Sequence, residues 1–220
     1  MTHTVSVDIV SDLVCPWCWL GKRYWDEARK LTGDITVETT WRPFQLDPTL
    51  AREGRPYKDY MREKFSDADA SGRWKAMRDH LEQAGPSVGI DFRFDGITRR
   101  PNTLNAHRLM RWAGGQGKSD TMAETLFAAF FNEARDIGDP TVLAELAGHA
   151  GLDATVTADL LATDRDDKSV WEEELFYRKL GVSGVPTYIF NGRFAVSGAQ
   201  EPTVLADAIR QAVKEPAETE

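Results

Sequence analysis

The 220-residue chain contains only two cysteines, and they lie three positions apart. A disulfide-stabilised scaffold would use more cysteines, spread along the chain. No apolar run is long enough to span a membrane. The first residues show neither the basic segment nor the long apolar segment of a signal peptide. We therefore expect a cytoplasmic protein that does not bind a membrane, in which the cysteine pair is catalytic, redox-sensing or metal-binding.

An excess of basic residues is also missing. The formal net charge is -8 at pH 7, which disfavours binding to nucleic acid or to an anionic membrane. Hydrophobic residues make up 41% and charged residues 28% of the chain, as in ordinary soluble globular proteins. A chain of this length buries enough surface for one enlarged domain or two small ones.

The cysteines lie between two predicted strands. Val5, Val7 and Ile9 alternate with polar residues and predict a strand that reaches about Val10. Residues 35–41 predict a second strand. Between the strands we expect a helix that the cysteines open and Gly33 ends. Its apolar face is expected to contain Leu20, Tyr24, Ala28 and Leu31.

Helical patterns dominate from residue 43 to about residue 168, and residues 52–56 and 86–101 are predicted loops. Four patterns carry this prediction. One helical face is expected to contain Trp74, Met77 and Leu81, and another Leu126, Phe130 and Ala134. Asp139 followed by Pro140 is typical of an N-cap and a first helical residue. A helix that Asn102 or Thr103 caps is expected to run to Ala113.

The last part of the chain predicts a β-β-α arrangement. A helix over residues 169–180 precedes a strand over 185–190 and a hairpin turn at Asn191–Gly192. A returning strand and a helix over 202–213 follow. We thus expect an α/β fold whose two parts, residues 1–42 and 171–214, form one discontinuous domain. Residues 43–170 are the predicted all-helical insertion domain, and residues 215–220 are a tail.

Cys15 and Cys18 are the candidate catalytic residues. Thiol chemistry needs a thiolate, and unpaired N–H groups with the positive end of the helix dipole stabilise one at a helix start. We expect Cys15 to face solvent and attack, and Cys18, one turn further along, to resolve the mixed disulfide. Pro16 is expected to stiffen the turn, and Trp17 to offer an apolar surface to the substrate.

A second candidate feature is Val185–Pro186 at the start of a predicted strand. Proline cannot donate to a strand ladder and favours such a position; an ordinary strand-start proline is one interpretation. The other is a cis peptide bond, which would leave the Val185 backbone exposed to pair with an extended substrate. Phe44 follows a strand end and is predicted either to line the substrate groove beside Cys15 or to pack in the core, as Trp41 and Trp112 are.

The alternative for the cysteines is half of a zinc site. Structural zinc sites need four ligands, and the sequence has no second CxxC motif and only four scattered histidines. We therefore predict no metal. His107 is expected to be an ordinary, hydrogen-bonded histidine of a helix.

Several stretches together resemble the thioredoxin superfamily, and within it the FrnE-like subfamily of DsbA-like oxidoreductases. They are Ser11–Cys18, Trp41–Leu46, Asn102–Thr103 with Ala106–Leu109, Gly184–Thr187 and Ser197–Gln200. The resemblance implies a thioredoxin fold with a helical insertion, a nucleophilic Cys15, a resolving Cys18 and a cis-proline at Pro186. Trp17 stands where periplasmic members have histidine.

The expected function is thiol–disulfide exchange, which covers oxidation, reduction or isomerisation of disulfides in proteins or small thiols. No cofactor is expected beyond the Cys15–Cys18 disulfide, with glutathione as an optional co-substrate. The chain also resembles glutathione-dependent enzymes of the kappa-class transferase and hydroxychromene-carboxylate isomerase type, which are the first alternative. The Asn102–Thr103 segment favours this alternative, and Cys18 argues against it. A redox-sensing chaperone is the second alternative. A monomer and a homodimer both remain open.

Overall fold

The computed structural model describes residues 3–215, apart from the side chains of residues 3 and 68–70. The chain divides into two compact units. Unit 1 consists of Met1–Leu46 and Trp171–Glu220, and unit 2 of Asp47–Val170. Of the predicted tail, only Glu215 belongs to the described residues.

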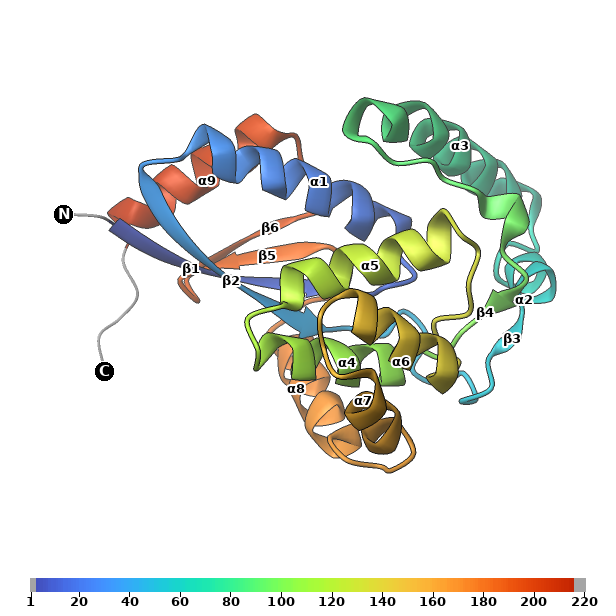
Figure 1. The fold of residues 1–220 in the computed structure, drawn as a ribbon. Coiled ribbons are helices and arrows are strands. Elements are labelled where there is room, and N and C mark those ends of the chain that lie inside the picture. The colour runs from blue at the N-terminus through green and yellow to red at the C-terminus, as the bar shows by residue number, and fades with distance from the viewer. Residues whose placement is uncertain (1–2, 216–220) are drawn as a thin grey trace. The chain divides into compact units, whose positions relative to one another are not determined.

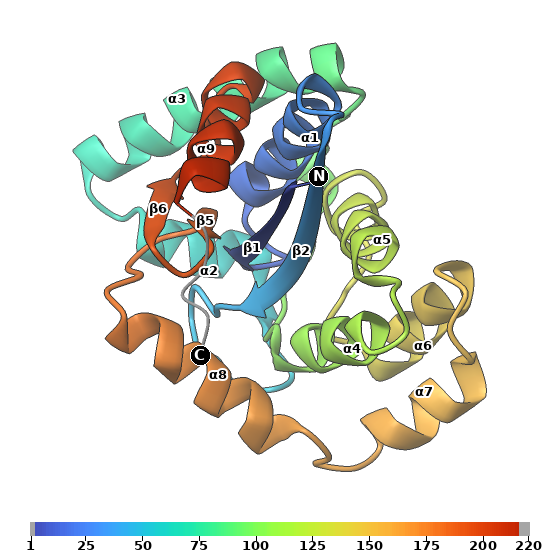
Figure 2. The same ribbon diagram turned by 90° about the vertical axis from the view of Figure 1, so that its left-hand side faces the viewer.

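Unit 1 is built on a four-stranded sheet with the order β2-β1-β5-β6. β1 runs parallel to β2 and antiparallel to β5, which pairs antiparallel with β6. The helices α1 and α9 lie side by side on one face of this sheet (Figures 1 and 2). The elements are β1 (His3–Ser11), α1 (Pro16–Leu31), β2 (Ile35–Pro43), β5 (Thr187–Phe190), β6 (Phe194–Ser197) and α9 (Pro202–Lys214). This is the predicted α/β fold, with β-α-β and β-β-α parts.

Both faces of β1 are buried. Val5, Val7 and Ile9 point to the face that α1 and α9 cover, because successive side chains of a strand alternate between faces. Val10 points to the other face and packs with Tyr177, which belongs to α8 (Asp167–Lys179). The central strand is therefore fixed from both sides up to the residue before Ser11.

The buried stripe of α1 differs from the predicted one. It passes through Trp25 and Ala28 and continues to Thr32, so the predicted core residue Leu31 is turned outward and is 52% exposed. Trp25 is fully buried, and its indole N–H donates to Thr39 Oγ1 over 3.3 Å. The apolar pattern of the helix did not predict the outward orientation of Leu31. The large side chain of Trp25, next to Tyr24 of the predicted stripe, is the one buried in the core.

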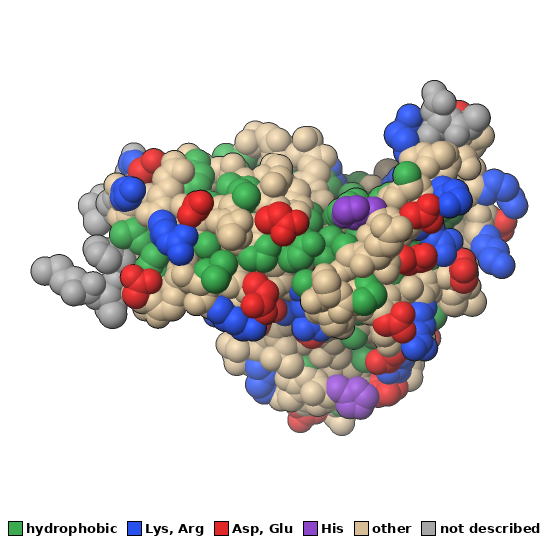
Figure 3. All heavy atoms as spheres, turned by 90° about the horizontal axis from the view of Figure 1, so that it is seen from above, with side chains coloured by type: hydrophobic (Ala, Val, Ile, Leu, Met, Phe, Trp, Pro, Cys, Tyr) green, Lys and Arg blue, Asp and Glu red, His purple; other side chains and the backbone are tan. Residues whose placement is uncertain are grey.

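The β5–β6 hairpin lies where Asn191–Gly192 predicted it. Asn191 and Gly192 have φ values of 51° and 69°, a conformation that asparagine and glycine tolerate best. The Asn191 side chain accepts from the Ser6 backbone N–H over 3.0 Å, which attaches the turn to β1. On the face of unit 1 that carries α1 and α9, acidic, basic and hydrophobic side chains are interspersed (Figure 3).

Unit 2 is mainly helical, as predicted for the insertion. Its helices are α2 (Tyr57–Lys64), α3 (Ala68–Ala84), α4 (Leu104–Gly114), α5 (Ser119–Phe131), α6 (Pro140–His149) and α7 (Ala154–Leu161). The predicted loops contain two-residue strands, β3 (Arg55–Pro56) and β4 (Arg99–Arg100), and two 3-10 helices, η1 (Gly85–Val88) and η2 (Phe94–Gly96). These elements are too short to show a periodic pattern in the sequence.

The end of α5 corrects another expectation. Ala134 was predicted to share a helical face with Leu126 and Phe130, but α5 ends at Phe131. Ala134 has a φ of 56°, which is left-handed and incompatible with continuing the helix. The start of α6 is as predicted, because Asp139 caps it by accepting from the Thr141 N–H over 2.7 Å, with Pro140 at the first turn.

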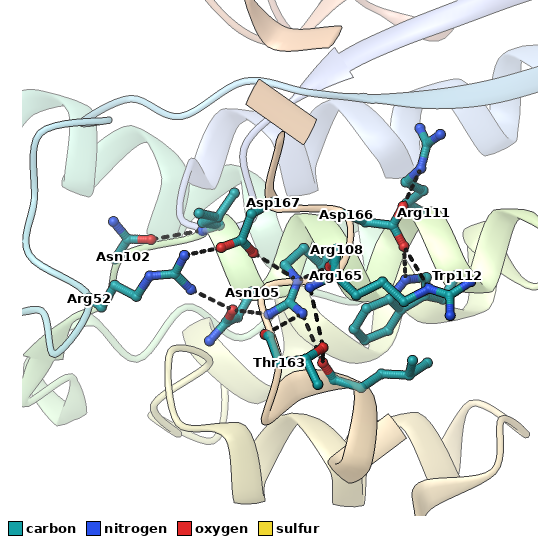
Figure 4. A network of polar contacts seen from close by, with 12 residues as sticks. Arg52, Asn102, Asn105, Arg108, Arg111, Trp112, Thr163, Arg165, Asp166 and Asp167 are labelled. Carbon is teal, nitrogen blue, oxygen red and sulfur yellow. Dashed lines mark hydrogen bonds and ion pairs between the residues drawn. The ribbon is translucent and has the colours of Figure 1, made fainter. Parts of the chain in front are cut away.

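The fully buried Arg108 of α4 connects that helix to the segment after α7 (Figure 4). Its guanidinium donates to the backbone carbonyls of Leu160, Thr163 and Arg165 over 2.7–2.8 Å. It also forms an ion pair with Asp167 at 3.0 Å. Arg108 therefore donates to carbonyl groups at the C-terminal end of α7 and directly after it.

Candidate active site

The cysteine pair lies at the start of α1, directly after β1. Cys15 is the N-cap residue and Pro16 the first helical residue, which confirms that the motif opens the helix. The Cys15 N–H donates to the Asp12 carbonyl, and the Cys18 N–H to the Cys15 carbonyl, each over 3.0 Å. Proline suits this position because the first N–H of a helix has no intrahelical partner. Trp17, between the cysteines, is half-buried.

Cys15 does not face solvent as predicted. It is 4% exposed, and its Sγ donates to the Val185 carbonyl oxygen over 3.7 Å. The Val185–Pro186 peptide bond is cis, and Pro186 directly precedes β5. Two segments separated by 170 positions in sequence thus meet at the sulfur within unit 1.

Cys18 is fully enclosed and one helical turn further along α1. Burial raises the pKa of the Cys18 thiol well above its usual range, and the neighbouring Cys15 raises the pKa further. The Ser11 hydroxyl and the Asp12 backbone N–H act in the opposite direction, because each is a nearby donor that favours the thiolate. Both cysteines are free thiols in this structure. Cys18 is therefore a protonated thiol at neutral pH.

Phe44 does not fit the predicted substrate contact. It is buried in a cluster with Val10 and Tyr177, and Val185 packs against this cluster. The Arg178 guanidinium lies over the Phe44 ring, 3.9 Å from its centre. Phe44 therefore supports Val185 from within the core and presents no open surface, because α8 covers the strand end from which Phe44 projects.

Two carboxylates accept hydrogen bonds from the segment after β2, and the sequence did not predict these contacts. The fully buried Asp12 accepts from the Leu46 N–H over 2.8 Å. Glu174 of α8 accepts from the Gln45 backbone N–H over 3.0 Å and from Gln45 Nε2 over 2.8 Å. No sequence signal connects these partners, which lie up to 129 positions apart.

Asp8, the other acidic residue near the motif, belongs to a structural ion pair. It accepts from Arg42 Nε over 2.7 Å and from the Tyr177 hydroxyl over 2.9 Å. Burial and the charge of Asp8 raise the pKa of Tyr177 above its usual range. Asp8 is therefore occupied in joining β1 to β2 and α8.

A surface cavity of about 530 Å³ lies along the segment that contains Val185 and Pro186. Its lining comes entirely from residues 180–198, and includes Leu180, Ile189 and Phe194. Among residues 3–215, no group of three or more His, Cys, Asp and Glu side chains is placed to hold a metal ion. In the same range, no helix combines the length and hydrophobicity needed to cross a membrane.

The chain matches the model of the family described as "DSBA-like thioredoxin domain" over residues 6–210. It therefore belongs to this family, and the strand–CxxC–helix unit and the β-β-α part are the two parts of its thioredoxin domain. Among solved structures, a probable DsbA oxidoreductase, SCO1869 from Streptomyces coelicolor, is similar over 98% of this chain and 93% of its own. The TM-score is 0.86 and the sequence identity is 29%.

Two further solved structures share the fold at lower identity. A 2-hydroxychromene-2-carboxylate isomerase has a TM-score of 0.71 and 13% identity, covering 96% of this chain and 97% of its own. The cytosolic disulfide reductase DsbM from Pseudomonas aeruginosa, solved with GSH, has a TM-score of 0.68 and 17% identity, covering 95% of this chain and 99% of its own. The architecture is thus common to disulfide oxidoreductases and to an isomerase.

Proposed function

We propose that the chain is a thiol–disulfide oxidoreductase in which Cys15 attacks and Cys18 resolves. The observation that carries this proposal is the different environment of the two sulfurs. Cys15 lies at the helix start against the Val185 carbonyl, while Cys18 is enclosed and held as a thiol by burial, which raises its pKa. We therefore propose that Cys15 reacts first.

The proposed exchange consists of two substitutions at sulfur. The Cys15 thiolate bonds to one sulfur of a disulfide partner, and the partner's S–S bond breaks and releases a thiolate. Cys18 then bonds to Cys15 Sγ, and the bond between Cys15 and the partner breaks. The protein ends as the Cys15–Cys18 disulfide, and the partner is reduced by two electrons; the reverse sequence oxidises a dithiol partner.

The surroundings supply what the first step needs. The unpaired N–H groups and the dipole of α1 favour negative charge at its N-terminus. The Val185 carbonyl, now occupied by the Cys15 thiol, is a backbone acceptor for an extended substrate segment. We propose Pro16, Trp17, Val185 and Pro186 as substrate contacts, and the cavity along residues 180–198 as room for side chains of the partner.

The test is turnover of a fluorescent disulfide peptide by the reduced protein, with Cys15→Ser and Cys18→Ser as matched variants. We expect wild-type turnover, none with Cys15→Ser, and a single mixed-disulfide event with Cys18→Ser. Absence of wild-type turnover, or turnover that survives Cys15→Ser, contradicts the proposal. The same assay with a dithiol peptide and oxidised protein measures the opposite direction.

A glutathione-dependent isomerase or transferase is the second candidate, favoured by the fold shared with 2-hydroxychromene-2-carboxylate isomerase. Two features of unit 1 and unit 2 disfavour it. In the proposed exchange, Cys18 displaces a thiol bound to Cys15. Asn102 has a structural use, because it donates to the Leu50 carbonyl over 2.6 Å and accepts from the Leu104 N–H over 2.9 Å. Glutathione-dependent isomerisation that survives Cys18→Ser would establish this candidate.

We also propose partners, a cellular location and an oligomeric state that are compatible with thiol–disulfide exchange. The partners are disulfide- or thiol-containing proteins and small thiols, with glutathione as an optional co-substrate by analogy with DsbM, which was solved with GSH. DsbM is described as cytosolic, in line with the proposed cytoplasmic setting. We propose a protein that binds neither nucleic acid nor membrane, acts as a monomer or homodimer, and consists of a thioredoxin-like domain and a helical insertion domain. The FrnE-like assignment and a chaperone activity remain proposals.

A further inference from the structure

Two buried hydroxyl groups near Cys18 have no use in the exchange described above. Ser11, the last residue of β1, is 2% exposed, and Tyr188 of β5 is fully buried. Within residues 3–215, neither hydroxyl has a well-formed hydrogen bond in the thiol state. Since buried polar groups are nearly always paired, each of these hydroxyls calls for an explanation.

The two hydroxyls differ in their relation to Cys18. The Ser11 hydroxyl is a nearby donor that lowers the pKa of the Cys18 thiol, although it is buried without a hydrogen-bond partner among the described residues in the thiol state. Tyr188 influences Cys18 only through charge, and its hydroxyl lies against the α1 backbone at Gly21, 2.6 Å from the position of a Cβ there. Within the described part of the chain, Ser11 is therefore an unpartnered donor that favours negative charge on the buried sulfur, whereas the Tyr188 hydroxyl is not a donor to that sulfur.

We propose that Ser11 donates a hydrogen bond to the Cys18 sulfur as it becomes a thiolate, and that this bond accelerates the resolving step. The inference rests on the proposed thiol–disulfide exchange. A neutral thiol is a weak acceptor, whereas a thiolate accepts a strong, charge-assisted hydrogen bond. The donor gains its partner only as charge develops on sulfur, so the bond lowers the barrier without stabilising the ground state.

The backbone around Ser11 keeps this donor in place before the reaction. The Ser11 carbonyl accepts from the Phe44 N–H over 3.1 Å, and the Asp12 carbonyl accepts from the Cys15 N–H over 3.0 Å. The Asp12 backbone N–H is a second donor to the Cys18 sulfur. Two donors on consecutive residues of a fixed segment thus surround the sulfur that must become charged in an enclosed site.

The resolving step balances with Ser11 as a donor only. Cys18 Sγ bonds to Cys15 Sγ, and the bond between Cys15 Sγ and the partner's sulfur breaks. The proton that Cys18 releases ends on the partner's departing thiolate. Ser11 keeps its own proton throughout, so Ser11 supplies stabilisation of charge and not general-base catalysis.

The experiment is stopped-flow reaction of the reduced protein with dithiobis(nitrobenzoate), an aromatic disulfide that releases one coloured thiolate per substitution. The first release reports attack by Cys15, and the second reports resolution by Cys18. We expect Ser11→Ala to slow the second phase by about tenfold, the effect of losing one hydrogen bond to a charged group. Its pH profile moves to higher pH, and the first phase is unchanged.

Two matched comparisons separate the hydrogen bond from a general effect of mutation. Tyr188→Phe removes a buried hydroxyl that is not aimed at the sulfur, and we expect wild-type rates in both phases. The side chains of threonine and valine have nearly the same shape, but only threonine carries a hydroxyl. We therefore expect Ser11→Val, and not Ser11→Thr, to slow the second phase. This pair keeps the test valid if Ser11→Ala does not fold.

A second phase that keeps its wild-type rate and pH profile in Ser11→Ala, or that is equal in Ser11→Thr and Ser11→Val, overturns the inference. So does a second phase that Tyr188→Phe slows as much as Ser11→Ala. Failure of the proposed function has a different signature, because wild type would then show no second phase at all.

Discussion

The buried Cys18 thiol is expected to make the folded protein less stable as the pH rises above neutral. Removing this thiol should therefore remove that part of the pH dependence. The comparison uses the Cys15→Ser protein and the Cys15→Ser/Cys18→Ala protein, so that no disulfide forms in either. Burial, the largest cause, raises the pKa of Cys18 well above its usual range in the folded protein, and this cause persists without Cys15. The unfolded chain has no such burial, so the two states of the chain bind the Cys18 proton with different affinity.

The magnitude follows from this difference in proton binding. An unfolded cysteine has a pKa of about 8.5. Below that pH both states hold the proton, and the contribution of Cys18 to stability is fully present. Above it only the unfolded state ionises, and the free energy of unfolding falls by about 1.4 kcal/mol per pH unit until pH reaches the raised pKa of folded Cys18. At a pH of roughly 9.5 the loss relative to neutral pH is about 1.4 kcal/mol.

The assay is urea unfolding of both proteins at a pH of about 7.5 and about 9.5. The cavity left by Cys18→Ala lowers stability equally at both values, so it cancels in the pH-dependent difference. Burial raises the pKa of Tyr57 to about 12, and the pKa values of Tyr177 and Tyr188 are also raised. These tyrosines are present in both proteins and cancel as well.

Two results would refute the reasoning. An equal pH dependence in both proteins would mean that folded Cys18 ionises as easily as an unfolded cysteine. A steeper decline in the protein that lacks Cys18 would mean that the sign of the proton linkage is reversed.

Two further predictions concern packing and the buried ion network. Gly21→Ala places a methyl group 2.6 Å from the Tyr188 hydroxyl and 3.0 Å from Pro186 Cγ and is expected to lower stability by about 1–3 kcal/mol; Tyr188→Phe in the same protein removes the closer contact and should recover part of the loss in thermal unfolding, and no recovery would contradict the clash. Arg108→Ala leaves Asp167 and three carbonyls without their buried donor and is expected to cost about 3–5 kcal/mol in urea unfolding. Arg111→Ala is the matched control, because Arg111 is partly exposed and its ion pair at 3.7 Å is worth at most about 1 kcal/mol; similar losses in both variants would disprove the role of Arg108.

Local patterns in the sequence predicted much of unit 1. The alternation of Val5, Val7 and Ile9 predicted β1, and Asn191–Gly192 predicted the hairpin, because strand periodicity and turn chemistry are properties of adjacent residues. The placement of Cys15 at a helix start followed for the same reason. Helical patterns from residue 43 to about residue 168 predicted the helical insertion, and the helices α2 to α7 confirm that this segment is mainly helical.

The remaining features depend on contacts between distant segments. The Cys15 thiol donates to the Val185 carbonyl, 170 positions away, and no local pattern reports such a contact. The outward orientation of Leu31 depends on how much of the core Trp25 fills. The hydroxyl of Ser11 acquires a possible function only because β1 ends beside Cys18, and a serine before the motif carries no such signal in the sequence.

The central claim is that Cys15 attacks and Cys18 resolves, and trapping the mixed disulfide tests it most directly. Reduced Cys18→Ser protein is mixed with a disulfide peptide, and the intact mass and the modified residue are determined by mass spectrometry. The account predicts one peptide adduct, located on Cys15, while wild type passes on to the Cys15–Cys18 disulfide without accumulating an adduct. An adduct that forms on Cys18 in Cys15→Ser at the same rate, or no adduct on Cys15 at all, would contradict it.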